Sequence, residues 1–281
     1  MPEVLRPDGA ALYYETAGAG TPLLALAPGG VSSGIERWAS SSLGSLTPLH
    51  SHSRVITMDQ RHAGRSRATL VPFSYEAAMG DQLAVLSDAG VSRAKVLGVG
   101  IGAAYALRLA YDAPAKVNAM VLIEPMGVAG DAGIGDYYNI FNDTIRMARA
   151  EGLAGVVEAA LANPSFVDNP AAGPWARRLH DEAAFREMLL GLSREMYIAL
   201  VVDFRDGMFP WGVPHFSVNN VALERMRVPA LVIAGDDVLH SQAAADALCA
   251  NLGTAQQLTS AHNVDLKQGI GDFLADHPMP V

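Results

Sequence analysis

Short apolar runs separated by polar or glycine-rich turns recur along the chain. These runs are typical of buried strands, and they occupy residues 10–16, 22–30, 53–59, 95–99, 117–125, 229–237 and 255–259. Apolar positions at helical spacing predict helices at 75–89, 102–112 and 241–251. Strands that alternate with helices in this way indicate an α/β protein, with a mostly parallel, twisted sheet flanked by helices.

The alternation of strands and helices stops between about residues 127 and 226. Two stretches in this region, 141–162 and 181–204, have a helical pattern, and no strand pattern separates them. We therefore predict three segments. Residues 1–126 form the first part of the α/β core, residues 127–226 form an inserted helical cap, and residues 227–281 complete the core.

Composition narrows the classes of partner. The 281 residues are 50% hydrophobic and carry a formal net charge of −9, which argues against nucleic acid or an anionic membrane as partner. A single cysteine, Cys249, excludes an internal disulfide and a multi-cysteine metal site. The sequence shows no secretory signal and no apolar run long enough to span a membrane. We expect a cytoplasmic protein with a small-molecule substrate, no metal and no cofactor, and we leave homo-oligomerisation open.

The segment "KVLGVGIGAAYALRLA", residues 95–110, predicts a strand, a tight glycine turn and a helix. Gly98, Gly100 and Ala103 match the dinucleotide-binding pattern G-x-G-x-x-G/A, and Glu124 follows at the end of the next strand. That pattern usually opens the first strand–helix–strand unit, whereas several predicted strands precede this one. The same residues match the nucleophile elbow G-x-S-x-G, with glycine at the apex instead of serine.

The flanking motifs favour the elbow, because their order resembles the α/β-hydrolase superfamily. The stretch "GALYYETAGAGTPLLALAPGG" is similar to the opening hairpin and oxyanion strand of that family, and "VITMDQRHAGRSRA" to its D-x-R-G-x-G-x-S segment. "VPALVIAGDD" and "SAHNVDL" lie where the family has its late acid and its histidine. The resemblance covers roughly residues 9–126 and 227–275. It implies an α/β-hydrolase fold in which glycine replaces the elbow nucleophile.

The resemblance also implies catalytic roles. His262 occupies the position of the catalytic histidine. Asp237 fits the commoner position of the acid that orients this histidine, and Asp236 lies beside it. Glu124 is the alternative, because some members of the family keep the acid after the strand that follows the elbow. Such an acid fixes the tautomer of the imidazole and stabilises the imidazolium.

Backbone donors for an oxyanion do not depend on the missing serine. The resemblance assigns this role to the amide of Ile101, at the start of the helix, and to an amide at Gly30 or Val31. An elbow apex needs a positive φ, which costs a residue with a Cβ about 1–2 kcal/mol. Glycine at position 100 adopts that φ freely. Its missing side chain leaves room for about one water molecule.

Three aromatic residues, Tyr137, Phe209 and Trp211, are weaker candidates for the lining of an apolar pocket under the cap. Asp59 and Arg61 are predicted to form an ion pair that braces the loop after their strand.

The residues together predict a cofactor-free enzyme that acts on a small, apolar carbonyl or ester-like substrate. In this hypothesis His262 activates a water molecule over Gly100. One alternative is a lyase, isomerase or cofactor-free oxygenase in which the histidine takes a proton from the substrate. Another is a ligand-binding protein without catalysis, either a natural pseudo-hydrolase or an engineered serine-to-glycine knockout. Incorporation of solvent ¹⁸O into the product separates hydrolysis from direct proton abstraction.

Overall fold

The computed structural model describes residues 3–258 and 266–279. In that part of the chain, eight strands form one sheet of order β1-β2-β4-β3-β5-β6-β7-β8. The strands are β1 (Glu3–Leu5), β2 (Ala11–Ala17), β3 (Thr21–Leu26), β4 (Ser53–Met58), β5 (Ala94–Val99), β6 (Val117–Ile123), β7 (Ala230–Ile233) and β8 (Ala255–Leu258). The β1–β2 and β2–β4 pairs are antiparallel, and the remaining pairs are parallel. The predicted α/β class with a mostly parallel sheet is confirmed.

Both faces of the sheet are buried, as its continuous apolar strands require. Leu24 and Leu26 of β3 face a layer formed by α1 (Tyr75–Asp88), α2 (Ile101–Asp112) and α9 (Gln242–Asn251). Leu23 and Ala25 point to the opposite face, because side chains alternate along a strand. That face packs against the 3₁₀ helix η2 (Ile35–Ser40) and against α10 (Leu266–Asp276). The three helices predicted in the core correspond to α1, α2 and α9.

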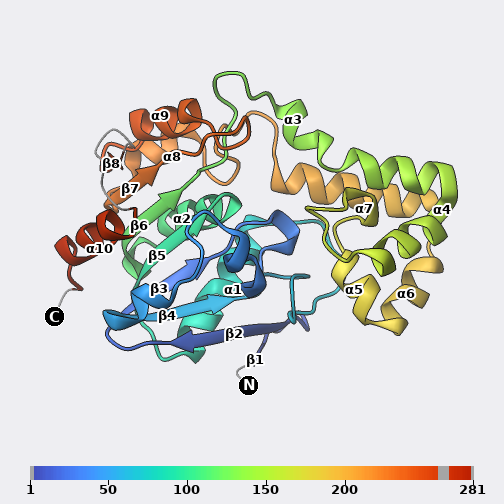
Figure 1. The fold of residues 1–281 in the computed structure, drawn as a ribbon, viewed down its shortest axis with the longest axis horizontal. Coiled ribbons are helices and arrows are strands. Elements are labelled where there is room, and N and C mark those ends of the chain that lie inside the picture. The colour runs from blue at the N-terminus through green and yellow to red at the C-terminus, as the bar shows by residue number, and fades with distance from the viewer. Residues whose placement is uncertain (1–2, 259–265, 280–281) are drawn as a thin grey trace.

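Six helices lie between β6 and β7 in the chain. They are α3 (Ile134–Asn139), α4 (Asn142–Ala162), α5 (Ala176–Asp181), α6 (Ala183–Leu190), α7 (Arg194–Met208) and α8 (Asn220–Arg225). Figure 1 shows α4 to α7 grouped beyond one end of the sheet, whereas α8 lies beside α9. The helices α3 to α7 therefore form a separate layer, called the cap below. In the described part of the chain, no helix combines the length and apolar character needed to cross a membrane.

Local chemistry explains where the cap helices end. The pattern over 181–204 predicts one helix, but the structure has two, α6 and α7, with a break near Gly191. The Ser193 side chain accepts a hydrogen bond from the amide of Met196 and so begins α7. Helix α4 is kinked at Gly152, where φ is 71°.

The predicted ion pair between Asp59 and Arg61 is wrong. The Arg61 guanidinium binds Asp81, with Nη2 2.9 Å from Oδ1. The Asp59 carboxylate accepts hydrogen bonds from the backbone amides of Ile35 and Arg65, at 2.7 and 2.8 Å. Asp59 therefore holds the loop in front of η2, a long-range role that the spacing of two neighbouring residues does not reveal.

Candidate active site

Gly100 forms the apex of a sharp turn between β5 and α2, with φ 57° and ψ −120°. The Gly100 amide donates to the carbonyl of Ile123, at the end of β6, over 2.9 Å. The Gly100 carbonyl accepts from the amide of Ala103 over 3.0 Å. The first helical amide, that of Ile101, donates to no described residue. The turn thus presents a backbone donor at the carboxyl edge of the sheet, where α/β proteins bind ligands.

The three glycines of the turn meet different surroundings. A Cβ built on Gly98 would lie 2.2 Å from the carbonyl oxygen of Gly102, and one built on Gly102 would lie 2.2 Å from the carbonyl oxygen of Leu26. No side chain fits at either position, because α2 packs directly on the strands. A Cβ on Gly100 would instead lie 3.3 Å from Nε2 of His240 and 3.6 Å from Cβ of Pro28. The apex of the elbow therefore faces an imidazole.

His240 lies in the loop that follows β7. Its Nδ1 is 2.9 Å from Oδ2 of Asp237, whose Oδ1 accepts the backbone amides of Leu239 and His240 at 2.8 and 2.9 Å. An ionised carboxylate only accepts hydrogen bonds, so this contact places the imidazole proton on Nδ1. Nε2 is then the acceptor that faces Gly100, and no described residue donates to it.

The charge of Asp237 is stabilised by its surroundings. Partial burial acts to raise its pKa, but the hydrogen bond and charge interaction with His240 act in the opposite direction. Together with the amides of His240 and Leu239 they outweigh burial, and the pKa of Asp237 is lowered. The acid is therefore ionised near neutral pH, as its contact with Nδ1 requires.

The hydroxyl of Tyr137 contacts the backbone of this loop. Its hydroxyl lies 2.9 Å from the carbonyl oxygens of Leu239 and Gly127, and it accepts the amide of Gly127 over 3.1 Å. The side chain is fully buried. The sequence predicts that Tyr137 lines the cavity under the cap, but it does not. Its hydroxyl instead joins the loop that carries His240 to the segment after β6.

A cavity of about 420 Å³ lies between the elbow and the cap. Gly30, Gly100, Ile101 and His240 line its floor. Its walls are mostly apolar and include Met126, Ile140, Phe141, Phe166, Val167, Met208 and Phe209. Phe209 thus lies where the sequence placed it. Trp211 does not, because it follows Pro210 in an outward turn and its side chain is 78% exposed.

Of the remaining predicted residues, one lines this cavity. Glu124 lines it and has a positive φ of 50°, with its amide donating to the carbonyl of Ile233 at the end of β7. Asp236 is exposed to solvent. Val31 belongs to the 3₁₀ helix η1 (Gly30–Ser32), directly after the turn that follows β3. His262 lies outside the described residues.

Sequence patterns alone assign no separate role to His240. It lies three residues after Asp237, directly before a predicted helix. The signal in the sequence is an acid followed by a histidine three residues later, in the loop after a parallel strand. This pattern would have identified Asp237 and His240 as a pair. Among the described residues, no group of three or more histidines, cysteines or acids is placed to hold a metal ion.

Comparison with known proteins identifies the family to which this fold belongs. A model of the alpha/beta hydrolase family matches residues 24–265. The chain belongs to this family.

Several solved α/β hydrolases share the fold. A hydrolase from Pseudomonas aeruginosa PA01 superposes with a TM-score of 0.60 at 25% identity, over 92% of this chain and 89% of that one. An enol-lactonase from Burkholderia xenovorans LB400 gives a TM-score of 0.61 at 18% identity, over 98% and 99%. At that identity the likeness concerns the fold alone.

A curated relative matches a smaller part of the chain. It is a putative carbamate hydrolase, RutD, from Azorhizobium caulinodans, and it is 35% identical over 112 residues. The match spans 40% of this chain and 40% of that relative.

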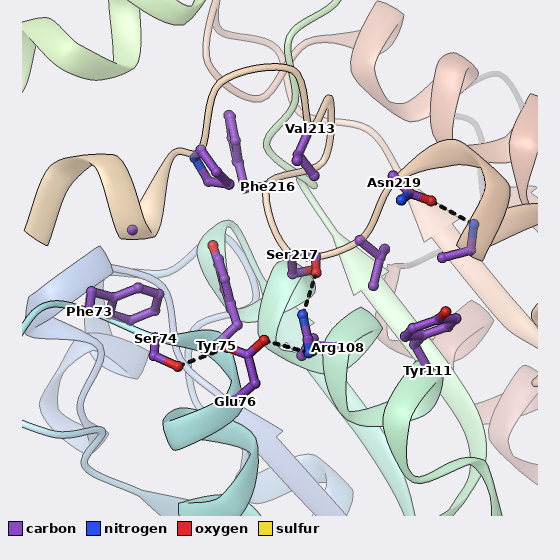
Figure 2. A pocket seen from close by; sticks show the side chains of 14 residues that line it. Phe73, Ser74, Tyr75, Glu76, Arg108, Tyr111, Val213, Phe216, Ser217 and Asn219 are labelled. Carbon is purple, nitrogen blue, oxygen red and sulfur yellow. Dashed lines mark hydrogen bonds and ion pairs between the residues drawn. The ribbon is translucent and has the colours of Figure 1, made fainter. Parts of the chain in front are cut away.

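This α/β hydrolase has a second pocket of about 400 Å³, which shares the segment 207–216 with the cavity over the elbow. Figure 2 shows Arg108 at its centre, directed at the carbonyl of Ser217 and at Glu76. The Arg108 guanidinium lies 2.8 Å from Glu76 and 2.6 Å from Asp112. Its charge is therefore neutralised within the protein, and no histidine is among the described residues that line this pocket.

Proposed function

We propose that this α/β hydrolase cleaves a small carbonyl or ester-like substrate with a water molecule that His240 activates over Gly100. One observation carries the proposal. The imidazole of His240 faces the glycine apex through Nε2 and is held through Nδ1 by an ionised Asp237. A glycine cannot form an acyl-enzyme, and water is the nucleophile in this proposal.

Each step of this hydrolysis has a residue to perform it. Water attacks the carbonyl carbon of the substrate and gives a proton to Nε2 of His240. The amides of Ile101 and of Gly30 or Val31 donate to the developing oxyanion. The bond to the leaving group then breaks, and the leaving group takes the proton from the imidazolium. Asp237 stabilises the positive charge between the two transfers.

The relatives support the same class of reaction. The curated relative is described as a putative carbamate hydrolase, and a carbamate is a carbonyl compound. The apolar walls of the cavity fit a substrate with an aliphatic or aromatic body.

The resemblance to the superfamily offers His262 as a second candidate for the base. The two histidines make different predictions, because only one of them activates the water. We expect His240→Gln to lower kcat by about 10²- to 10⁴-fold, the usual contribution of a general base. His262→Gln should lower kcat by less. A full loss in His262→Gln with normal turnover in His240→Gln would transfer the role to His262.

The same assays test the class of reaction. Turnover in H₂¹⁸O should place one solvent oxygen atom in the carboxylic acid product. A product formed without solvent oxygen would favour the lyase or isomerase alternative, in which His240 takes a proton from the substrate. Absence of turnover with every ester, amide and carbamate tested, in a folded protein, would favour a binding protein.

A further inference from the structure

Arg37 gives the cavity over the elbow one charged wall. It is the one arginine or lysine among the described residues that line this cavity. It lies on η2, and Ser40, Ser41 and Ser42 line the same side. The rest of the lining is mostly apolar, except for Glu124 and His240 at the elbow.

The guanidinium of Arg37 has little to bind within the protein. Among the described residues its closest acid is Asp168, with Nη1 3.9 Å from Oδ2, and the Asp168 side chain is 65% exposed. Nε of Arg37 is buried and has no hydrogen-bond partner among the described residues. A guanidinium presents five N–H donors, and buried donors are normally satisfied. The donors on Nη1 and Nη2, which come no closer than 3.9 Å to a described carboxylate, are therefore the ones available to a ligand.

Other arginines of similar exposure are paired far more closely. The side chains of Arg61, Arg178 and Arg108 are 14%, 12% and 21% exposed, against 19% for Arg37. Each of the three has a carboxylate oxygen at 3.1 Å or closer. A long contact is thus not the general condition of half-buried arginines in this chain.

Arg37 is held next to the reacting centre. Its amide donates to the carbonyl of Gly34 over 3.0 Å, and Asp59 fixes the start of η2 through the amide of Ile35. A Cβ built on Gly29 would lie 3.3 Å from Nε of Arg37. Gly29 follows Pro28, whose Cβ would lie 3.6 Å from a Cβ built on Gly100. The guanidinium and the apex therefore belong to neighbouring parts of one cavity wall.

We infer that Arg37 binds a carboxylate of the substrate, so that the enzyme acts on short esters or amides that carry a free carboxylate at the end remote from the bond that is cleaved. Arginine is suited to this role because its planar fork binds both carboxylate oxygens at once. The inference rests on the proposed function, in that it assigns a second group of the same substrate. It adds an anionic group to the apolar body that the cavity walls favour.

Two esters that differ in one group test this inference. Monomethyl succinate and methyl butanoate have similar length, but only the first ends in a carboxylate. We expect the wild type to prefer monomethyl succinate. Arg37→Gln should raise KM for this ester by about 10- to 100-fold, the range for loss of a charge-assisted hydrogen bond, and change KM for methyl butanoate by less than about twofold. Arg37→Lys keeps the charge without the planar fork, so its KM for monomethyl succinate should lie between those of the wild type and Arg37→Gln.

Arg177→Gln is the matched control. Arg177 lies 3.9 Å from Glu36 of η2 and borders a smaller hollow that it shares with Arg37, but its guanidinium is already paired with Asp181 at 2.8 Å. It does not line the cavity over the elbow. Arg177→Gln should therefore leave the preference between the two esters unchanged. An equal loss in both variants would overturn the inference.

A second control separates substrate binding from a structural contact with the cap. If Arg37 only held Asp168, Asp168→Asn would reproduce the loss seen in Arg37→Gln. We expect Asp168→Asn to leave KM for monomethyl succinate unchanged or to lower it, because it removes a competing negative charge. Matching losses in these two variants would overturn the inference.

Binding measured without turnover distinguishes the inference from the proposed function. Calorimetric titration of His240→Gln with monomethyl succinate should show binding that a further Arg37→Gln substitution weakens by a similar factor. Binding without hydrolysis in the wild type would contradict the proposed function and leave the carboxylate site intact. Hydrolysis of both esters with equal KM would contradict the carboxylate site and leave the proposed function intact.

Discussion

Two pockets of nearly equal size, about 420 and 400 Å³, lie on either side of the segment 207–216. In the outer pocket, Arg108 is surrounded by Glu76, Asp112 and a backbone carbonyl (Figure 2). In the cavity over the elbow, Nε2 of His240 faces a bare apex, and no acid in the described part of the chain lies closer to Arg37 than 3.9 Å. Size does not distinguish the two pockets, but the availability of their polar groups does.

This difference has a physical basis. A charge that is already paired has little to gain from a ligand, because the ligand must displace the partner that holds it. An imidazole oriented by an acid, with its other nitrogen unpaired, is prepared to accept a proton. The comparison therefore predicts that substitutions of similar size have unequal effects in the two pockets.

The largest effect is expected at Asp237. Asp237→Asn keeps an oxygen that can accept the amides of Leu239 and His240, but it removes the charge that orients and stabilises the imidazole. We expect kcat to fall by about 10²- to 10⁴-fold, with a melting temperature close to that of the wild type. Steady-state kinetics and thermal denaturation of the purified variant measure both quantities.

Arg108→Gln in the outer pocket is the matched control for that substitution. It removes a charge whose side chain is 21% exposed, against 61% for Asp237, and whose partners are Glu76 and Asp112. Exposed ion pairs of this kind contribute about 0–1 kcal/mol, so stability should change little and kcat by less than about twofold. A loss in Arg108→Gln as large as that in Asp237→Asn would remove the distinction between the two pockets.

A smaller effect, on stability instead of activity, is expected at the wall between the pockets. Burial lowers the pKa of His215 from 6.5 to about 4. Above pH 6.5 the imidazole is neutral in the folded and the unfolded chain, so it has no effect. Below this pH only the unfolded chain takes up the proton, and stability falls until the pH reaches about 4. The slope is about 1.4 kcal/mol per pH unit for one such group.

Denaturant unfolding at pH 7 and pH 5 measures this slope. His215→Gln should reduce the loss of unfolding free energy on acidification, and the exposed His52→Gln should not. Burial also lowers the pKa of His62, to about 3, so His215→Gln should leave part of the acid sensitivity in place. An unchanged slope in His215→Gln would show that the imidazole is protonated in the folded chain.

The sequence predicts the sheet well because its signals are local. Apolar runs predict the buried strands, and the glycines at 98 and 102 predict a turn that no larger residue permits. The short elements are harder to predict. The 3₁₀ helix η2 has no apolar period, and one helical pattern over 181–204 conceals the break near Gly191.

The site depends on contacts between distant parts of the chain. Asp237 is predictable from its place after a strand, but the position of His240 over Gly100 follows from the folding of a loop 140 residues away. Arg37 reaches the cavity because Asp59 holds the start of η2. Tyr137 is an aromatic residue of the kind that lines apolar pockets, yet its buried hydroxyl lies within hydrogen-bond distance of two carbonyl oxygens. No local pattern distinguishes these roles.

The central claim is that the imidazole of His240 acts on whatever group lies at the apex of the elbow. Gly100→Ser tests it most directly, because the new side chain would begin 3.3 Å from Nε2 of His240. The positive φ costs this variant about 1–2 kcal/mol, which a folded domain of this size tolerates. A fluorophosphonate then reports on the new hydroxyl. The serine oxygen attacks the phosphorus atom, fluoride leaves, and the proton of the hydroxyl passes to His240.

Intact-protein mass spectrometry of the Gly100→Ser variant measures the adduct. If His240 acts on the group at the apex, Gly100→Ser should carry a single covalent adduct, and the wild type and Gly100→Ala should carry none. Adding His240→Gln should abolish the labelling of Gly100→Ser. A folded Gly100→Ser variant that stays unlabelled, or whose labelling is indifferent to His240→Gln, would contradict the central claim.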